Sequence, residues 1–309
     1  MFRETCRVLE NKKIAPGHFV IKFASKKIGK KAQPGEFVQI LCSDSYEPLL
    51  PRPFSFLTAT PSNFSILYHT VGRGTTLLSQ AKKGDVFHIL GPLGRGFTVV
   101  SSQISAIRKK QKIPLIPDYR LLTTFILVGG GVGIPPLFHW AEYTLKRRLV
   151  SKQSIHVFLG ARDKSLLLCE DSFKKLGVQL HLATDNGSKG HKGVVTDLLK
   201  QFFLSSVSCP LSSVVYTCGP TPMLKAVSAL AKKYEIACEV SVEVPMACGF
   251  GACLGCAVKV RPQKTENRKQ KTESKNLSFA ICPPSSEQYR FAVACCEGPV
   301  FPAGDIVWD

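Results

Sequence analysis

The sequence predicts a multidomain β plus α/β protein, with an antiparallel β-barrel, then a doubly wound parallel α/β domain, then a small cysteine-rich C-terminal domain. Three observations support this order. Residues 1–100 contain short apolar runs separated by glycine and proline, residues 121–240 alternate apolar strands with helical segments, and the stretch 248–256 holds three cysteines. The 309 residues are enough for two or three domains with cores of their own.

The first hundred residues are expected to form a small barrel. Four apolar runs read as strands, at 19–23, 37–41, 64–68 and 86–90. Pro34-Gly35 and Lys83-Gly84-Asp85 supply turns between them. Several short strands at this spacing are typical of an antiparallel barrel.

The segment Pro51-Arg52-Pro53-Phe54-Ser55 is a candidate ligand-binding strand of this barrel. The guanidinium of Arg52 can bind a phosphate bidentately or lie on a ring system, and Ser55 adds a hydroxyl donor. An edge strand whose prolines block pairing explains the same residues equally well.

A second candidate follows the strand 64–68, where Val71-Gly72-Arg73-Gly74-Thr75-Thr76 reads as a loop opening a short helix. Free N–H groups and threonine hydroxyls at a helix start can bind an anion, although a plain N-cap is the alternative. Taken with Arg52, this loop predicts a barrel that binds a pyrophosphate, and FAD is the natural candidate.

The α/β domain is expected over residues 121–240, after a connector at 101–120 that holds a basic run and two prolines. The apolar run 121–128 predicts a buried parallel strand. It leads into Gly129-Gly130-Gly131-Val132-Gly133-Ile134-Pro135-Pro136, and a helix over 137–148 follows. Such glycines let the backbone approach a pyrophosphate at a helix start, and prolines suit the first helical turn. The spacing is not that of the G-x-G-x-x-G fingerprint.

Further strand–helix units complete the predicted sheet. We expect strands at 155–159, 179–183 and 214–218, and helices at 166–176, at 194–203 and ending at Tyr234. Sheets of this kind bind ligands at the carboxyl ends of their strands. Cys218-Gly219-Pro220 lies at such an end, so Cys218 is expected to contact the ligand, with a small buried hydrophobe as the alternative.

The cysteine-rich stretch begins the C-terminal domain, expected over 241–309. Cys248, Cys253 and Cys256 have C-x4-C-x2-C spacing, and Cys295-Cys296 follows near the C-terminus. This spacing is that of plant-type [2Fe–2S] clusters, held by four thiolates. A structural zinc site usually has two C-x2-C-like pairs, of which only one is present here, and buried cysteines are the remaining alternative. A basic, polar insertion at 261–288 contains Cys282, which is an unlikely ligand because the sequence around it predicts a flexible segment.

The composition restricts the class of protein. A hydrophobic fraction of 44% is that of a globular protein, and no uninterrupted apolar stretch is long enough to span a membrane. The N-terminal residues do not resemble a signal peptide, and twelve cysteines in such a chain point to a reducing compartment, so we expect a cytoplasmic location.

The formal net charge of +19 raises the possibility of nucleic-acid binding. Much of the charge falls in three polar segments, near 26–31, 108–112 and 264–275. None of them interleaves aromatic residues with basic ones, as a stacking platform for bases would. We therefore expect a solvated basic surface and no nucleic-acid partner, with an acidic protein partner as an alternative.

Together the three modules resemble the ferredoxin–NAD(P) reductase superfamily. More narrowly, nearly the whole chain resembles the electron-transfer subunits of class 1B dihydroorotate dehydrogenases. The residues that carry the narrow resemblance are Met246-Ala247-Cys248-Gly249-Phe250-Gly251-Ala252-Cys253-Leu254-Gly255-Cys256, Cys295 with Gly298-Pro299-Val300-Phe301, Arg52-Pro53-Phe54-Ser55, and Asp185-Asn186-Gly187-Ser188 with Gly190-His191-Lys192-Gly193. Two departures are the longer gap before Cys295 and the enlarged connector at 101–120.

The resemblance implies three sets of site residues. FAD would be bound by Arg52, Pro53, Phe54, Ser55, Leu67, Tyr68, His69, Gly74 and Thr75. NAD would be bound by Gly129, Gly130, Gly131, Gly133, Cys218, Gly219 and Pro220. The [2Fe–2S] cluster would be held by Cys248, Cys253, Cys256 and Cys295, with Cys296 as the neighbour that could replace Cys295.

The resemblance also implies a partner and a direction of electron flow. Dihydroorotate would be oxidised in a separate FMN-containing catalytic subunit, in a heterotetramer of two plus two chains that serves pyrimidine biosynthesis. Electrons would pass through the cluster to FAD and then to NAD⁺, with no catalytic side chain required. The alternative is the reductase subunit of a sulfide dehydrogenase, hydrogenase or glutamate synthase. The sequence does not choose between NADH and NADPH.

Overall fold

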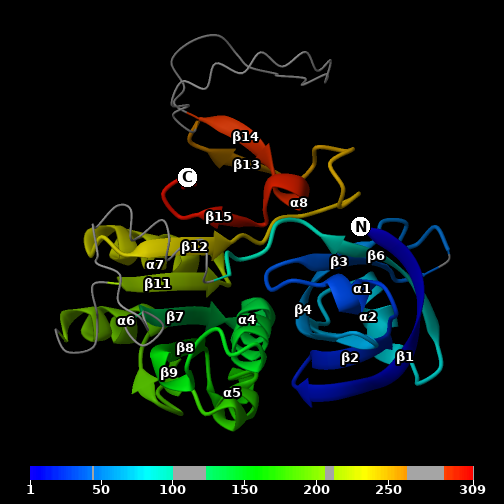
Figure 1. Cartoon of the computed structure of the whole chain (residues 1–309). Coiled ribbons are helices and arrows are strands. Elements are labelled where there is room, and N and C mark those ends of the chain that lie inside the picture. Colours follow the sequence, from blue (N-terminus) through cyan, green and yellow to red (C-terminus); the bar gives the residue numbers. More distant parts are fainter. Residues whose placement is uncertain (44, 100–122, 206–211, 263–288, 309) are drawn as a thin grey trace.

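The computed structural model describes residues 1–43, 45–99, 123–205, 212–262 and 289–308. The expected connector at 101–120, most of the expected basic insertion at 261–288 and Cys282 lie outside the described residues. Figure 1 shows three parts, namely a barrel in blue, an α/β part in green and yellow, and a C-terminal part in orange and red.

The first part is a closed six-stranded barrel in the order β1-β2-β5-β4-β3-β6. All its pairs are antiparallel. Its strands are β1 (Phe2–Ala15), β2 (His18–Ala24), β3 (Phe37–Leu41), β4 (Arg52–Thr60), β5 (Asn63–His69) and β6 (Val86–Leu93). Two short helices, α1 (Ile28–Lys31) and α2 (Arg73–Gln80), lie in its connections.

The four strands expected in the barrel are present, and the structure adds β1 and the full length of β4. Only Cys6 and Val8 of β1 are buried, while most of its other side chains are charged or polar and exposed. The strand therefore has no apolar run that a sequence pattern would detect. It is held by pairing with β2 on one side and β6 on the other.

The second part is a seven-stranded sheet in the order β10-β9-β8-β7-β11-β12-β15. Every pair is parallel except β12 with β15. Its strands are β7 (Thr123–Gly130), β8 (Ile155–Ala161), β9 (Gln179–Thr184), β10 (His191–Lys192), β11 (Ser212–Cys218), β12 (Ala237–Ser241) and β15 (Val300–Pro302). Its helices are α4 (Ile134–Lys146), α5 (Glu170–Leu176), α6 (Val195–Leu204) and α7 (Thr221–Lys233).

Helices cover both faces of this sheet, as expected of a doubly wound fold. Alternate residues of β7 show the two faces, because Phe125 and Leu127 pack with α4 and α5, whereas Ile126 and Val128 pack with α6 and α7. Together with the barrel and the C-terminal part, this sheet confirms the predicted fold class.

Two details of the sheet differ from expectation. The helix expected over 166–176 begins only at Glu170, because Lys164–Leu166 forms a 3-10 turn capped by Asp163 and Cys169 has a φ of +60°. The sheet also has an antiparallel edge, because β15 comes from the C-terminal part of the chain and pairs with β12.

The C-terminal part consists of the antiparallel pair β13 (Ala257–Val260) and β14 (Arg290–Val293), followed by α8 (Ala294–Glu297) and β15. Its core is shared with the other two parts. Cys256, Ala294 and Cys295 pack in one buried cluster with Phe37 of the barrel and Val240 of the sheet. The cysteine loop, drawn in orange beside α8 in Figure 1, is thus anchored where the three parts meet.

The barrel and the sheet are joined by α4. Leu57 of β4 and Leu67 of β5 are buried in the same cluster as Leu137 and Ala141 of α4. The ring of Phe56 lies edge-on to the ring of His139, with 6.1 Å between centroids. This apolar contact places the Arg52 strand opposite the carboxyl ends of β7 and β11.

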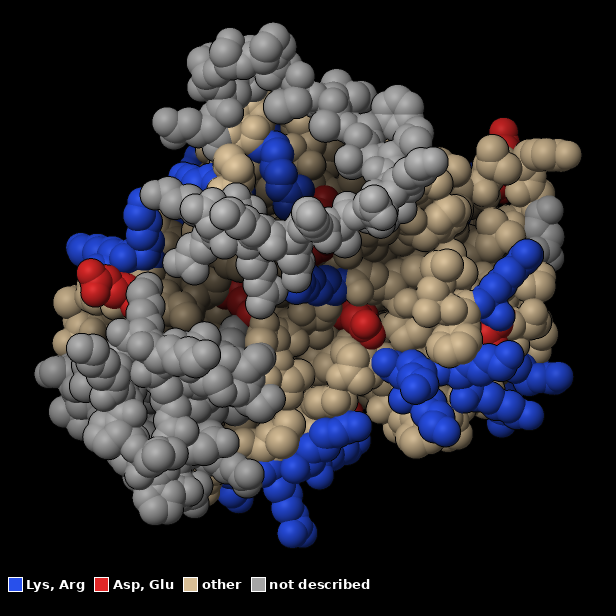
Figure 2. All heavy atoms as spheres, turned by 45° about the horizontal axis from the view of Figure 1, so that its top comes forward, with Lys and Arg blue, Asp and Glu red and all other residues tan. Residues whose placement is uncertain are grey.

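Basic side chains are spread over the surface. On the face shown in Figure 2, Lys and Arg stand in several separate groups with uncharged residues between them. No helix in the described part of the chain is both long and apolar enough to cross a lipid bilayer.

Barrel packing gives a first prediction. Phe64 is fully buried, and its ring centroid lies 5.4 Å from those of both Phe23 and Phe56. Phe64→Ala should lower the free energy of unfolding by about 3–5 kcal/mol, since it removes buried apolar area and leaves a cavity. Urea unfolding followed by circular dichroism measures the loss. Phe291→Ala, at a ring that is 55% exposed, is the control, and equal midpoints for the two variants would contradict the packing described here.

Candidate functional site

A cavity of about 340 Å³ lies between the barrel and the sheet. Many of the residues predicted to bind FAD line it, namely Arg52, Pro53, Phe54, Ser55, Leu67, Tyr68, His69 and Thr75. Gly74 is adjacent, because a Cβ at this position would lie 3.4 Å from both Cγ and Nε of Arg52. Cys218, Val132 and Pro299 close the opposite wall. The cavity therefore combines residues of all three parts.

Arg52 supplies positive charge to this cavity. Its Nη1 donates hydrogen bonds to the carbonyl oxygens of Leu50 at 2.7 Å and Pro51 at 3.3 Å. Among the ion pairs of the described residues none involves Arg52. The guanidinium is held in place by neutral acceptors, so its charge is left for an anionic ligand.

The start of α2 is a capped helix end. The Oγ1 atom of Thr75 accepts hydrogen bonds from the N–H groups of Val71 at 2.9 Å and Gly72 at 3.2 Å, and it donates to the carbonyl oxygen of Gly72 at 2.9 Å. Thr76 donates to the same carbonyl. The two threonine hydroxyls therefore hydrogen-bond within the helix start, as in the N-cap alternative. The groups there that can bind an anion are backbone N–H groups and Arg52.

Aromatic rings form the wall contributed by β4 and β5. The ring of Tyr68 lies edge-on to Phe54 at 5.9 Å and is stacked near Phe19 at 5.7 Å. Its hydroxyl donates to Oδ1 of Asn11 at 3.2 Å. His69 stacks on His18 at 4.3 Å, and burial together with that neighbour lowers the pKa of His69. These rings offer flat surfaces for a planar ligand.

The glycine loop after β7 lies beside the Cys218 loop after β11. Gly129 and Cys218 are partners in the parallel register. A Cβ at Gly133 would lie 2.5 Å or less from backbone atoms of Cys218 and Gly219, so only glycine permits this approach. At Gly130 a Cβ would lie 3.6 Å from Pro220, whereas at Gly131 it would meet nothing within 4 Å. The seven residues predicted to bind NAD are therefore together at one edge of the sheet.

Cys218 is a neutral group in this site. Burial raises its pKa, and the nearby negative charge of Glu243 acts in the same direction. Ser241 and Glu243 also line the cavity, and sequence analysis missed both. Ser241 is the last residue of β12 and Glu243 follows it, and β12 is a short strand with no strong apolar pattern, so only the sheet topology places them here.

The cysteine loop directs backbone N–H groups at sulfur atoms. Gly251 donates to Sγ of Cys295 at 3.1 Å, Cys253 donates to Sγ of Cys248 at 3.4 Å, and Cys295 donates to Sγ of Cys256 at 3.3 Å. Gly249 and Gly251 have φ values of +81° and +88°. Such a turn, with glycine at positive φ and N–H groups aimed inward, suits thiolates that carry negative charge.

The four predicted ligands form two pairs of thiols. Cys248 is in contact with Cys253, and Cys295 is in contact with Cys256 and also with its neighbour Cys296. Although burial opposes ionisation, backbone N–H groups of Phe250, Cys253 and Ala252 lower the pKa of Cys248 to about 6. Among the described residues, no three His, Cys, Asp or Glu side chains are grouped to hold a single metal ion. Two pairs fit a two-iron cluster better than a mononuclear zinc site, which needs four ligands around one ion.

Cys296 differs from Cys295 in its surroundings. Cys295 is buried and accepts the Gly251 N–H, whereas Cys296 is exposed, with its Sγ 3.8 Å from that of Cys295. Burial, followed by the neighbouring thiols of Cys256 and Cys296, raises the pKa of Cys295. These contacts favour Cys295 as the fourth ligand.

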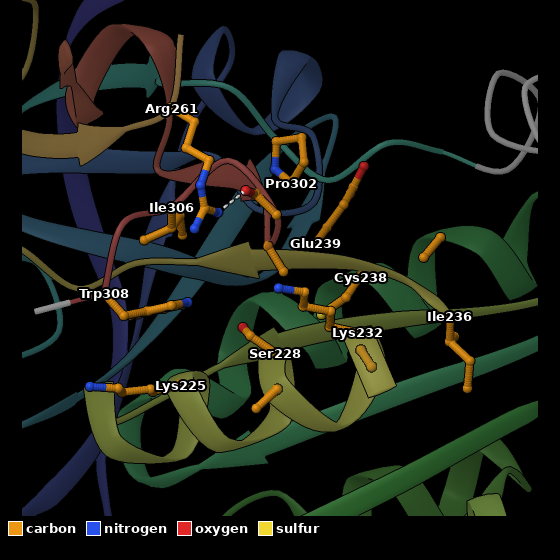
Figure 3. A pocket seen from close by; sticks show the side chains of 15 residues that line it. Lys225, Ser228, Lys232, Ile236, Cys238, Glu239, Arg261, Pro302, Ile306 and Trp308 are labelled. Atoms are coloured by element: carbon orange, nitrogen blue, oxygen red, sulfur yellow. Dashed lines mark hydrogen bonds between the residues drawn. The ribbon is translucent and has the colours of Figure 1, made fainter. Parts of the chain in front are cut away.

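A larger hollow, of about 670 Å³, lies elsewhere, between α7, β12 and the C-terminal segment (Figure 3). It shares no lining residue with the cavity of Arg52. Arg261 and Trp308 point into it from the C-terminal part, and Lys225 and Lys232 border it from α7. None of the predicted site residues lines this hollow, so it is not the site of the predicted chemistry.

Comparisons with known proteins agree with this arrangement. The family model for an oxidoreductase NAD-binding domain matches residues 127–229, and the model for the iron-sulfur cluster binding domain of dihydroorotate dehydrogenase B matches residues 243–271. The dihydroorotate dehydrogenase B (NAD(+)), electron transfer subunit, of Desulforamulus reducens is 33% identical over 98% of this chain and 97% of the relative. This chain belongs to that family. The corresponding subunit of Caldanaerobacter subterraneus subsp. tengcongensis is 34% identical over 98% of this chain and 97% of its own length.

The fold of this electron transfer subunit family member is also similar to the folds of several solved structures. A chain from the structure of an NADH-dependent reduced ferredoxin-NADP oxidoreductase has a TM-score of 0.72 and 28% identity, over 98% of this chain and 90% of that one. The ferredoxin reductase of carbazole 1,9a-dioxygenase has a TM-score of 0.59 and 16% identity, over 76% and 66% of the two chains. The second likeness concerns the fold alone.

Serine variants of the neighbouring residues Cys295 and Cys296 test which of the two cysteines is the fourth cluster ligand. Cys295→Ser should lose the cluster, because it removes a buried thiol that accepts a backbone N–H, whereas Cys296→Ser should keep it. Iron content per chain and visible absorbance measure both variants. A Cys295→Ser protein with full iron beside a Cys296→Ser protein without it would transfer the ligand role to Cys296.

Proposed function

We propose that this chain is the electron-transfer subunit of an NAD-dependent dihydroorotate dehydrogenase that serves pyrimidine biosynthesis. The observation that carries the proposal is the cysteine site, in which Cys248 lies with Cys253 and Cys256 lies with Cys295. Backbone N–H groups are directed at these sulfurs, and the site lies next to a cavity lined by barrel and sheet. The family membership supplies the class of reaction.

The cofactors of the proposal are FAD, a [2Fe–2S] cluster and NAD. FAD would occupy the Arg52 cavity, with the guanidinium on its phosphates and the Tyr68 wall beside its rings. The close approach of Gly133 to Cys218 and Gly219 would give NAD a flat backbone surface at the dipole-positive start of α4. When bound, these groups supply the exchange between hydride and single-electron transfer, and the protein supplies placement.

The side chains of this chain would bind, orient and exclude water. The buried thiol of Cys218 stays neutral, so it adds no negative charge beside a hydride path. Phe37, which is 2% exposed, lies in the packed core with Cys256 and also lines the cavity. It therefore separates the flavin cavity from the cysteine loop with an apolar side chain, which keeps water out of the space between them.

The partner would be an FMN-containing catalytic subunit, in an assembly of two plus two chains. An FMN-bearing (β/α)8 barrel needs roughly 250 residues, which is more than any of the three parts of this 309-residue chain provides. The chain is therefore proposed to pass electrons and not to oxidise dihydroorotate alone.

The cysteine loop also offers the contact surface for this partner. Phe250 and Leu254 are 50% and 51% exposed, and both lie between the cysteines of the loop. Large apolar side chains at this exposure are typical anchors of a protein interface. Docking there would place the partner's redox group next to the cluster.

The direct test uses the protein purified without added cofactors. We expect one FAD and two irons per chain, released on acid treatment and measured by absorbance and iron assay, and NADH-dependent reduction of a one-electron dye. Addition of the FMN-bearing subunit should couple dihydroorotate oxidation to NAD⁺ reduction. Zinc without iron or flavin would reject the proposal, and capture of a hydrogenase or sulfide dehydrogenase partner would favour the alternative reductase function.

The docking surface gives a prediction that is separate from the chemistry. Phe250→Ser with Leu254→Ser should weaken binding to the catalytic subunit by at least tenfold in Kd, because each change removes an exposed apolar anchor. Dye reduction by the isolated chain should be unchanged. Val194→Ser, at a valine that is 53% exposed in the α/β part, is the control for calorimetric titration. Equal affinities for the double variant and the control would place the interface elsewhere.

A further inference from the structure

Gln39, in the middle of β3, is a buried amide whose hydrogen-bonding groups are unused. The residue is 1% exposed, and neither its Oε1 nor its Nε2 has a hydrogen-bond partner among the described residues. Its neighbours Val38 and Ile40 are buried in the barrel core, so the alternation of the strand points Gln39 out of the barrel. A buried amide left unpaired is destabilising, which makes its presence between two core residues unexpected.

The amide lies against the cysteine loop. A Cβ at Gly249 would be 2.5 Å from Cγ and 2.9 Å from Nε2 of Gln39. Gly249 directly follows Cys248 and has a φ of +81°, so the absence of a side chain at this position lets the loop backbone rest on the glutamine.

The amide does not face the flavin cavity. Pro53, its register partner on β4, lines that cavity, and so does Phe37 two residues before it, but Gln39 does not. Gln39 therefore stands behind the wall of the cavity, between the Pro53 strand and the loop of Cys248. A ligand for its N–H is expected on the side of the loop.

We propose that Gln39 is a positioning residue for the iron–sulfur cluster, and that its Nε2–H donates a hydrogen bond to a sulfur of the bound cluster or of its ligand Cys248. The proposal rests on the proposed function, which places a [2Fe–2S] cluster at these cysteines. A thiolate or sulfide is a charged acceptor that fits a buried, unused N–H donor. The Nε2–H that has no partner among the described residues would thereby gain a charged acceptor.

This bond sets the reduction potential of the cluster. Reduction adds negative charge to the cluster, and a hydrogen bond to sulfur stabilises that charge, so it raises the potential. A Met side chain has nearly the length of Gln but no N–H donor, so Gln39→Met removes the bond and keeps the packing.

The test compares Gln39→Met with the wild-type chain, each carrying its FAD and cluster. In a redox titration followed by electron paramagnetic resonance, the variant should disfavour cluster reduction about tenfold, which is about 59 mV for a one-electron couple. The FAD potential should stay unchanged. Gln201→Met, at an exposed glutamine of α6, is the matched control and should leave both potentials unchanged.

Thermal unfolding supplies a second readout, because the change in Tm caused by Gln39→Met should differ in sign between the protein with the cluster and the protein without it. Without the cluster, Gln39→Met should leave Tm unchanged or raise it, because an unpaired amide is removed. With the cluster, the same variant should lower Tm and lose iron faster to a chelator.

The outcomes of these measurements distinguish the role of Gln39 from the proposed function of the chain. An unchanged cluster potential in Gln39→Met, a shift confined to FAD, or a Tm change of the same sign with and without cluster would overturn the role of Gln39 and leave the proposed function intact. A wild-type chain that binds no iron would instead remove the proposed function together with this inference.

Discussion

The pairing of β15 with β12 determines where the functional groups of this chain can lie. Val300 and Phe301 pair with Ser241 and Val240, and the N–H of Val242 extends the contact by donating to the carbonyl oxygen of Pro299 at 3.0 Å. The loop of Cys248 leaves this pair on one strand, and the segment of Cys295 enters it on the other. One short antiparallel contact therefore fixes both halves of the cysteine site to the sheet, and Val242 and Pro299 carry the same contact to the wall of the cavity.

Apolar packing then holds the barrel to this junction. Phe37 shares a core with Val240 and Cys256, and α4 shares another with Leu57 and Leu67 of the barrel. These contacts bring residues of all three parts to the wall of the Arg52 cavity and hold the cysteine loop next to Phe37 in that wall. Because each part contributes to both cores, a shift of the barrel relative to the sheet would move the cavity and the loop together. The arrangement suits electron exchange, which requires two cofactors to stay at a constant separation.

Sequence patterns predicted the parts of this fold that depend on local chemistry. The apolar runs of β3 and β7, the glycines at the end of β7 and the spacing of Cys248, Cys253 and Cys256 all reflect constraints within a few residues. The strand β1 escaped prediction because its long-range pairing, and not burial, holds it. Glu243 and Gln39 escaped for a related reason, since each stands alone in its segment and acquires its neighbours only when distant strands are brought together.

The pairing of β13 with β14 determines how much the length of the chain between these strands affects the cysteine site. Cys256 and Cys295 are 39 positions apart, yet the pairing of Ala257 with Val293 brings the residues next to them together. The entropy of closing a loop grows only with the logarithm of its length, and here the strands have already closed it. Residues inserted between β13 and β14 therefore add almost nothing to the free energy of cluster assembly. On this argument the length of the stretch has little effect on the cysteine site, whereas the two strands on either side of it are needed to form that site.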